Sequence, residues 1–163
     1  MKTAVVYYSM SGNTEYAAEK IAAQLGADLI RVEPEKAYPT KGLGKFFVGG
    51  KSALGKEAPD LKPYQFDAEA YGRVVIGMPV WAGCVTPPIN TFVKENLETL
   101  QGKKIAAFVC SKGGGPEKVL EKLRQALGIE AFEAELSLIE PKNKADAANE
   151  MRITAFCNAL KEE

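Results

Sequence analysis

Histidine is absent from the 163 residues of this chain, and cysteine and tryptophan are scarce. Without histidine, the chain lacks the most common general base and the most common metal ligand. The cysteines are odd in number and far apart, which makes a poor disulfide framework and a poor zinc site; they are Cys84, Cys110 and Cys157. This cysteine usage favours a reduced, cytoplasmic compartment.

Net charge and long hydrophobic runs are absent as well. Lysine plus arginine equals aspartate plus glutamate, at 21 residues each, so no overall field attracts nucleic acid or an anionic membrane. No apolar run approaches the roughly 18 residues of a membrane span, and the stretch before the first expected strand is too brief for a signal peptide. We expect a single domain over residues 1–163, with a core that needs no disulfide or metal.

Apolar runs typical of buried strands alternate with helical patterns along the chain. Strands are expected at residues 3–8, 28–33, 73–78, 104–110 and 131–139. Helical spacing is found at residues 14–25, 87–100, 119–127 and 145–160. The last of these is expected to bury Ala148, Met151, Ala155, Phe156, Ala159 and Leu160. The alternation predicts an α/β fold, with a five-stranded parallel sheet covered by helices on both faces.

Residues 34–71 are the least regular part of the chain. Apolar residues at helical intervals predict a short, glycine-weakened helix near 43–54. Lysines in segment 41–56 form either a basic patch near a phosphate or partner, or an ordinary solvated face; they are Lys41, Lys45, Lys51 and Lys56.

A hydroxyl-rich turn, Ser9-Met10-Ser11-Gly12-Asn13-Thr14, lies where the first expected strand gives way to a helix. The unpaired N–H groups and partial positive charge of a helix N-terminus favour an anion, and Gly12 allows close approach. The turn has neither the Lys-Ser/Thr pair of a P-loop nor the three glycines of the dinucleotide fingerprint. It therefore suits a phosphate monoester held by neutral donors, although a simple capped helix is the alternative.

This turn resembles the Ser/Thr-x-Ser/Thr-Gly-x-Thr loop of the flavodoxins and their relatives, which holds the phosphate of flavin mononucleotide (FMN). The resemblance implies a flavodoxin-like three-layer sandwich with strand order 2-1-3-4-5, and FMN as the cofactor. It implies phosphate binding by Ser9, Met10, Ser11, Gly12, Asn13 and Thr14.

That strand order brings the loops after the first, third and fourth strands around one crevice. By resemblance, the second and third of these loops enclose the isoalloxazine ring. Trp81 is expected either to stack on the ring or to cap the core from its loop. Lys112 stands where many flavodoxins carry a tyrosine, which leaves one face of the ring open. The residues expected to bind FMN here are Pro79, Val80, Trp81, Ala82, Gly83, Ser111, Lys112, Gly113, Gly114 and Gly115.

Two redox functions and one non-redox function remain at this point. The first is a monomeric flavodoxin that shuttles single electrons between redox partner proteins. The second is an FMN-dependent oxidoreductase in which NAD(P)H reduces the flavin and a quinone or similar small acceptor oxidises it. The third is an interaction module without flavin. Typical flavodoxins are markedly acidic, so the neutral charge of this chain weakens the first function. The lack of a nicotinamide-binding motif weakens the second. No catalytic residue is assigned, and Cys84 and Cys110, which flank the expected site, are expected to act as small buried hydrophobes or in thiol chemistry.

Overall fold

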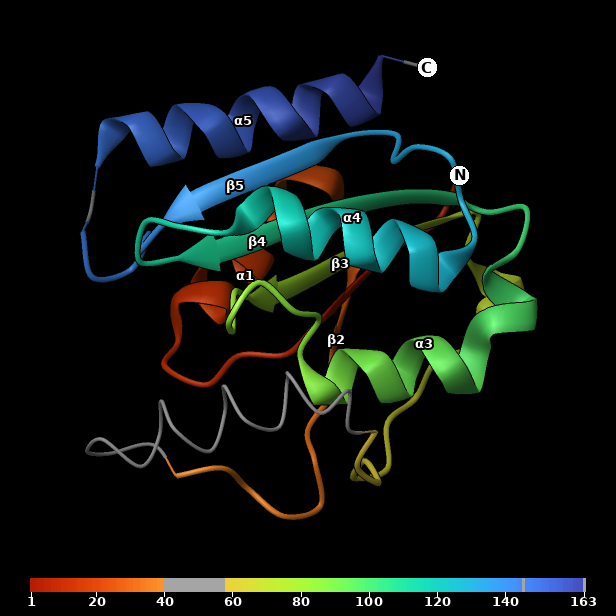
Figure 1. Ribbon diagram of the computed structural model, residues 1–163. Coiled ribbons are helices and arrows are strands. Elements are labelled where there is room, and N and C mark those ends of the chain that lie inside the picture. Colours follow the sequence, from red (N-terminus) through yellow and green to blue (C-terminus); the bar gives the residue numbers. More distant parts are fainter. Residues whose placement is uncertain (40–57, 145, 163) are drawn as a thin grey trace.

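A five-stranded parallel sheet forms the centre of the protein in the computed structural model, which describes residues 1–39, 58–144 and 146–162. The strands lie in the order β2-β1-β3-β4-β5, as predicted. Their bounds are β1 Thr3–Tyr7, β2 Asp28–Arg31, β3 Arg73–Pro79, β4 Lys104–Ser111 and β5 Glu135–Ile139. All the strand pairs are parallel, so the carboxyl ends of the strands meet at one edge of the sheet; in Figure 1 the arrowheads of β4 and β5 lie at the same side.

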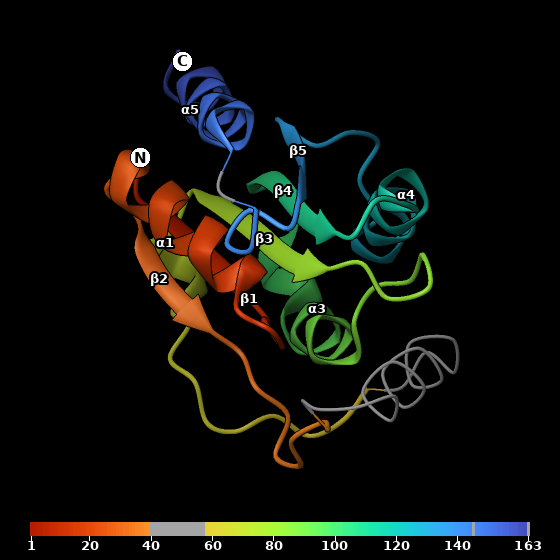
Figure 2. The ribbon, with the colours of Figure 1, turned by 90° about the vertical axis from the view of Figure 1, so that its left-hand side faces the viewer.

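Helices cover both faces of this sheet, which makes three layers (Figures 1 and 2). One face carries α1 (Asn13–Leu25) and α5 (Ala147–Lys161), and the other carries α3 (Pro87–Leu100) and α4 (Pro116–Leu127). A short 3-10 helix, η1 (Ala68–Ala70), precedes β3. The three central strands are almost wholly buried because both of their faces are covered, whereas β2 and β5 are edge strands with exposed positions.

The helix boundaries follow local chemistry in the chain. Helix α1 ends at Gly26, whose left-handed conformation lets its N–H reach the Ala22 carbonyl. Helix α3 begins with Pro87 and Pro88, where the missing N–H groups would have no helical partner. No helix of the described residues is both long enough and apolar enough to cross a bilayer.

The buried face of α5 differs from the expected one. Ala148, Met151, Ala155 and Ala159 are exposed, and Met151 is 72% exposed. Phe156 and Leu160 are buried as expected, and the helix also buries Asn149, Ile153 and Cys157. Apolar residues occur all around this helix, so spacing alone selects no face; packing against β5 and α1 makes the selection.

The two edge strands are shorter than predicted. Strand β5 begins at Glu135 rather than Ala131, because Phe132 turns into the core beside α4 and Glu133 forms an ion pair with the buried Arg73. Strand β2 ends at Arg31, two residues early. The helix expected at 43–54 and the lysines of segment 41–56 lie outside the described residues.

Gly77 on β3 lies directly against the ring of Phe108. A Cβ atom added at Gly77 would lie 2.0 Å from the Phe108 ring, which is fully buried against it. We predict that Gly77→Ala lowers the free energy of unfolding by about 3 kcal/mol, because the ring has no free volume to move into. Chemical denaturation measures the change.

Gly114→Ala is the matched control, since a Cβ there meets nothing within 4 Å, and its stability should stay within about 0.5 kcal/mol of the parent. Adding Phe108→Leu to Gly77→Ala should recover part of the loss. A Gly77→Ala protein as stable as the parent would contradict this packing.

Candidate functional site

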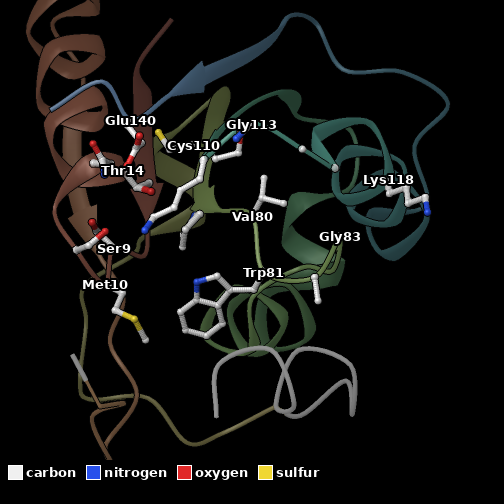
Figure 3. Close-up of a pocket in the computed structure, with 18 of the residues that line it drawn as sticks. Ser9, Met10, Thr14, Val80, Trp81, Gly83, Cys110, Gly113, Lys118 and Glu140 are labelled. Carbon is white, nitrogen blue, oxygen red and sulfur yellow. The ribbon is translucent and has the colours of Figure 1, made fainter. Parts of the chain in front are cut away.

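A cavity of about 880 Å³ opens at the carboxyl ends of β1, β3 and β4. Its volume lies within the roughly 300–1,000 Å³ that is usual for small-molecule sites. All the residues predicted to bind FMN line it, with the exception of Gly12. In Figure 3, Ser9, Thr14 and Glu140 gather at one side of the cavity, while Trp81 and Val80 lie across from them. The three loops singled out by the sequence therefore do face one common space.

The turn between β1 and α1 presents an uncapped helix N-terminus. Gly12 precedes α1 with a φ of 96°, and no side chain caps the helix. The buried Ser9 hydroxyl accepts the Gly12 N–H at 3.2 Å, which closes the turn internally. The N–H groups of the first helical turn thus keep their capacity to bind an anion.

Two polar residues of this turn are already bonded within the protein. The Asn13 Oδ1 accepts the Lys142 N–H at 2.9 Å and the Asn143 N–H at 3.4 Å. The Thr14 hydroxyl is buried and interacts with the Cys110 thiol. Ser11 remains as the exposed hydroxyl of the turn. Asn13 and Thr14 therefore shape the site as well as line it.

Arg31, at the end of β2, supports the same turn from outside the cavity. Its guanidinium donates to the Ser9 carbonyl at 3.2 Å and to Glu15 in the first turn of α1 at 2.5 Å. It also donates to Glu33 at 2.9 Å. Sequence reasoning missed this role, since an arginine in an edge strand gives no signal beyond a solvated charge.

The loop after β3 contains a tight turn at residues 81–84. The Cys84 N–H donates to the Trp81 carbonyl at 2.9 Å, and both central residues have positive φ, 50° at Ala82 and 66° at Gly83. This combination is typical of a type I′ turn. Glycine adopts such a conformation freely, whereas Ala82 adopts it at a cost of about 1 kcal/mol. The turn thus holds a backbone conformation that one of its two central residues disfavours.

Trp81 has a packing role and a site role together. Its ring meets Tyr8 edge-to-face at a centroid distance of 5.6 Å and Tyr38 at 5.4 Å. It packs on the core side that carries α3 and α4, yet it remains partly exposed and lines the cavity. Trp81 therefore caps the core, as one interpretation of the sequence expected, and it also presents a surface to the cavity, which the other interpretation requires.

The loop after β4 leads into α4, whose N-terminus also has no side-chain cap. The Ser111 hydroxyl accepts the Gly113 N–H at 3.2 Å, and Gly115 leads into α4 with a φ of 82°. A Cβ at Gly115 would lie 3.5 Å from Val80 Cγ1 and 3.7 Å from Gly83 Cα. The second and third loops are therefore in contact, and two helix N-termini face the cavity region.

Four further residues line the cavity, and the sequence prediction did not place them in it: Cys110, Glu117, Lys118 and Glu140. Glu140 follows β5 with an unfavourable φ of 42°. A hydrogen bond from Lys144 at 2.7 Å holds the pKa of Glu140 below its usual range, and the charge of Lys112 adds to this. The position of Glu140 near the site could have been predicted from the sequence, because β5 ends at the same edge of the sheet as β4.

Burial controls the chemistry of the cavity's cysteine. It raises the pKa of the Cys110 thiol to about 12 and that of Cys157 to about 11. At pH 8, only about one Cys110 in ten thousand is then a thiolate, the reactive form. We predict that iodoacetamide leaves Cys110 and Cys157 unmodified in the native protein and alkylates both in guanidinium, as peptide mass spectrometry can show. Rapid native alkylation of Cys110 would contradict its burial.

Comparisons with known proteins place this geometry in a family. The family model described as Flavodoxin matches residues 2–147. A protein from Bacteroides eggerthii, whose structure is described as that of a flavoprotein, shares 25% identity at a TM-score of 0.76 and covers 99% of each chain. A flavoprotein from Lactobacillus acidophilus, solved in complex with FMN, shares 23% identity at a TM-score of 0.70 and covers 87% of this chain and 95% of its own. Oxidised flavodoxin 2 from Bacillus cereus shares 18% identity at a TM-score of 0.60, with 99% of each chain covered.

A partial likeness to a viral protein also occurs. Envelope glycoprotein B of Equine herpesvirus 4 is 26% identical over 134 residues, or 79% of this chain. The chain spans only 14% of the length of that glycoprotein. The family model, by contrast, covers residues 2–147, which is most of this chain. The chain belongs to the flavodoxin family.

Proposed function

We propose that this protein binds FMN in the cavity and carries single electrons between redox partner proteins. One observation carries the proposal: an uncapped helix N-terminus and an aromatic wall, from loops far apart in the chain, line the same cavity. FMN has a doubly ionisable phosphate at one end and a planar apolar ring at the other. The cavity offers a matching environment to each.

The phosphate end is served by the turn from Ser9 to Thr14. The N–H groups at the start of α1, together with the Ser11 hydroxyl, are donors for phosphate oxygens. Charge-assisted hydrogen bonds contribute about 1.5–3 kcal/mol each. Several of these plus a packed ring reach the roughly 12 kcal/mol of a nanomolar complex, after the cost of association.

The ring end is served by Trp81 and by the glycine-rich loop. The indole offers an apolar surface whose orientation is fixed by Tyr8 and Tyr38. Gly114 is exposed and lines the cavity, so its N–H group can bind the carbonyl edge of the ring. When bound, FMN supplies the electron storage, and the protein tunes it through packing, hydrogen bonds and local charge.

Two titratable groups of the described cavity bear on the choice between an electron carrier and an oxidoreductase. Reduction of a quinone by two electrons also needs proton delivery. The two groups of the described cavity with displaced pKa values both move away from neutrality: that of Glu140 falls and that of Cys110 rises. A carrier that passes one electron at a time requires neither of them to exchange a proton.

We predict that FMN quenches the fluorescence of Trp81, the single tryptophan, and raises the melting temperature of the protein. Reductive titration of the complex by dithionite should then proceed in two separate one-electron steps. Rapid bleaching by NADPH in a single two-electron step would favour the oxidoreductase instead. A colourless protein that shows neither quenching nor thermal stabilisation would refute both redox functions.

Substitutions in the first turn test the phosphate assignment. We predict that Ser11→Ala combined with Thr14→Ala weakens FMN binding at least about tenfold, since a hydroxyl contact to a charged group is lost and the turn loosens. Isothermal titration measures the affinity, and Ser137→Ala, on edge strand β5 and away from the described cavity, is the control. Unchanged affinity of the double variant would show that the phosphate lies elsewhere.

A further inference from the structure

Residues 140–144, which follow β5, form a fourth wall beside the first turn. Glu140 lines the cavity, and the backbone N–H groups of Lys142 and Asn143 both donate to Asn13 Oδ1. At the other side, the buried Asn149 donates to the Ile139 carbonyl at 3.2 Å and to the Lys144 carbonyl at 3.5 Å. Asn13 thus fixes this loop against the start of α1, and Asn149 fixes it against α5.

The side chain of Lys142 lies directly beside Gly12. A Cβ on Gly12 would be 2.9 Å from Lys142 Nζ, 3.3 Å from Cδ and 3.7 Å from Cε. The positive φ at position 12 favours glycine, and a Cβ there would also displace the flexible end of the Lys142 side chain. Gly12 and Lys142 lie beside the cavity rather than in its lining.

Lys142 is an uncommitted cation beside the first turn. Glu15 is neutralised by Arg31, and Glu140 by Lys144. Within residues 1–39, 58–144 and 146–162, the Lys142 ammonium has no hydrogen bond or ion pair. The turn from Ser9 to Thr14 contains no basic residue of its own.

We propose that Lys142 is the cationic partner of the phosphate in this site, and that Asn13 positions it. The inference rests on the proposed function, since it assumes a phosphate monoester at the first turn. Such a group carries a charge of about −1.5 to −2 at pH 7, whereas a helix N-terminus supplies only about half a positive charge. The flexible four-carbon stem of Lys142 allows its ammonium to move from beside Gly12 to the phosphate oxygens.

Asn13 has a distinct part in this arrangement. Its side-chain oxygen holds the backbone of Lys142 itself, so the loop that carries the cation is tied to the turn that binds the anion. Removal of this tether leaves the ammonium present but no longer directed at the turn. Asn13 is therefore a positioning residue in addition to a lining residue.

The test compares FMN with riboflavin, which has the same ring and ribityl chain but no phosphate. Lys142→Met keeps the apolar stem beside Gly12 and removes the charge. Lys161→Met removes the same charge from the last turn of α5, at the end of the helix away from the loop (Figure 1). Dissociation constants are measured by flavin fluorescence at low and at high ionic strength, and the melting temperature of each flavin-free variant checks its fold.

We expect Lys142→Met to weaken FMN about three- to tenfold at low ionic strength, and the loss to shrink as salt screens the charge. Riboflavin affinity should not change, and Lys161→Met should bind both flavins like the parent. In an Asn13→Ala background, the additional effect of Lys142→Met should be smaller than in the parent, because the cation has already lost its position.

The two proposals fail in different ways. If the parent binds FMN and Lys142→Met binds it equally well, or loses FMN and riboflavin affinity alike, the role of Lys142 is wrong while the FMN site stands. A full effect of Lys142→Met in the Asn13→Ala background overturns the positioning role of Asn13. If the parent itself binds neither flavin, the proposed function is wrong and this inference is wrong with it.

Discussion

The arrangement depends on one backbone conformation, the left-handed Gly12 that turns the chain from the end of β1 directly into α1. This turn leaves the first N–H groups of α1 without a side-chain cap, which is a cost for the helix and the source of its affinity for an anion. The surrounding contacts maintain the conformation. Ser9 closes the turn from within, Arg31 holds the Ser9 carbonyl, and the loop after β5 docks against Asn13. The unpaired N–H groups at the start of α1 are thereby kept beside the cavity, where they are available to a ligand.

The helices and strands could be predicted from the sequence because hydrophobic periodicity and turn residues indicate the same elements. The alternation of strands and helices and the glycine at the end of α1 follow from local patterns. The strand order 2-1-3-4-5 was implied by the resemblance to flavodoxins, and the parallel sheet makes the three loops converge once that order is accepted. The buried face of α5 could not be read in the same way. Apolar residues occur on several sides of that helix, so tertiary packing selects Ile153 over Met151.

Only part of the site could be predicted from the sequence, because some of its residues are brought together by contacts between distant parts of the chain. Residues within the three loops could be named because each loop has an unusual composition. Lys142 comes from a stretch of ordinary composition and Arg31 from an edge strand, so only their neighbours in space relate them to the site. Trp81 illustrates a related limit. A loop tryptophan can either pack or face a ligand, and the structure combines both by setting it edge-on to two tyrosines.

The hydrogen bond between Asn13 and Lys142 joins residues 129 positions apart in the sequence. A contact of this separation carries a large entropic cost of loop closure, because a long segment of chain must be ordered before its ends meet. During synthesis, the first turn leaves the ribosome long before the loop after β5 exists. A growing chain therefore carries the beginning of the pocket without its last wall, and flavin capture is deferred until the sheet is complete.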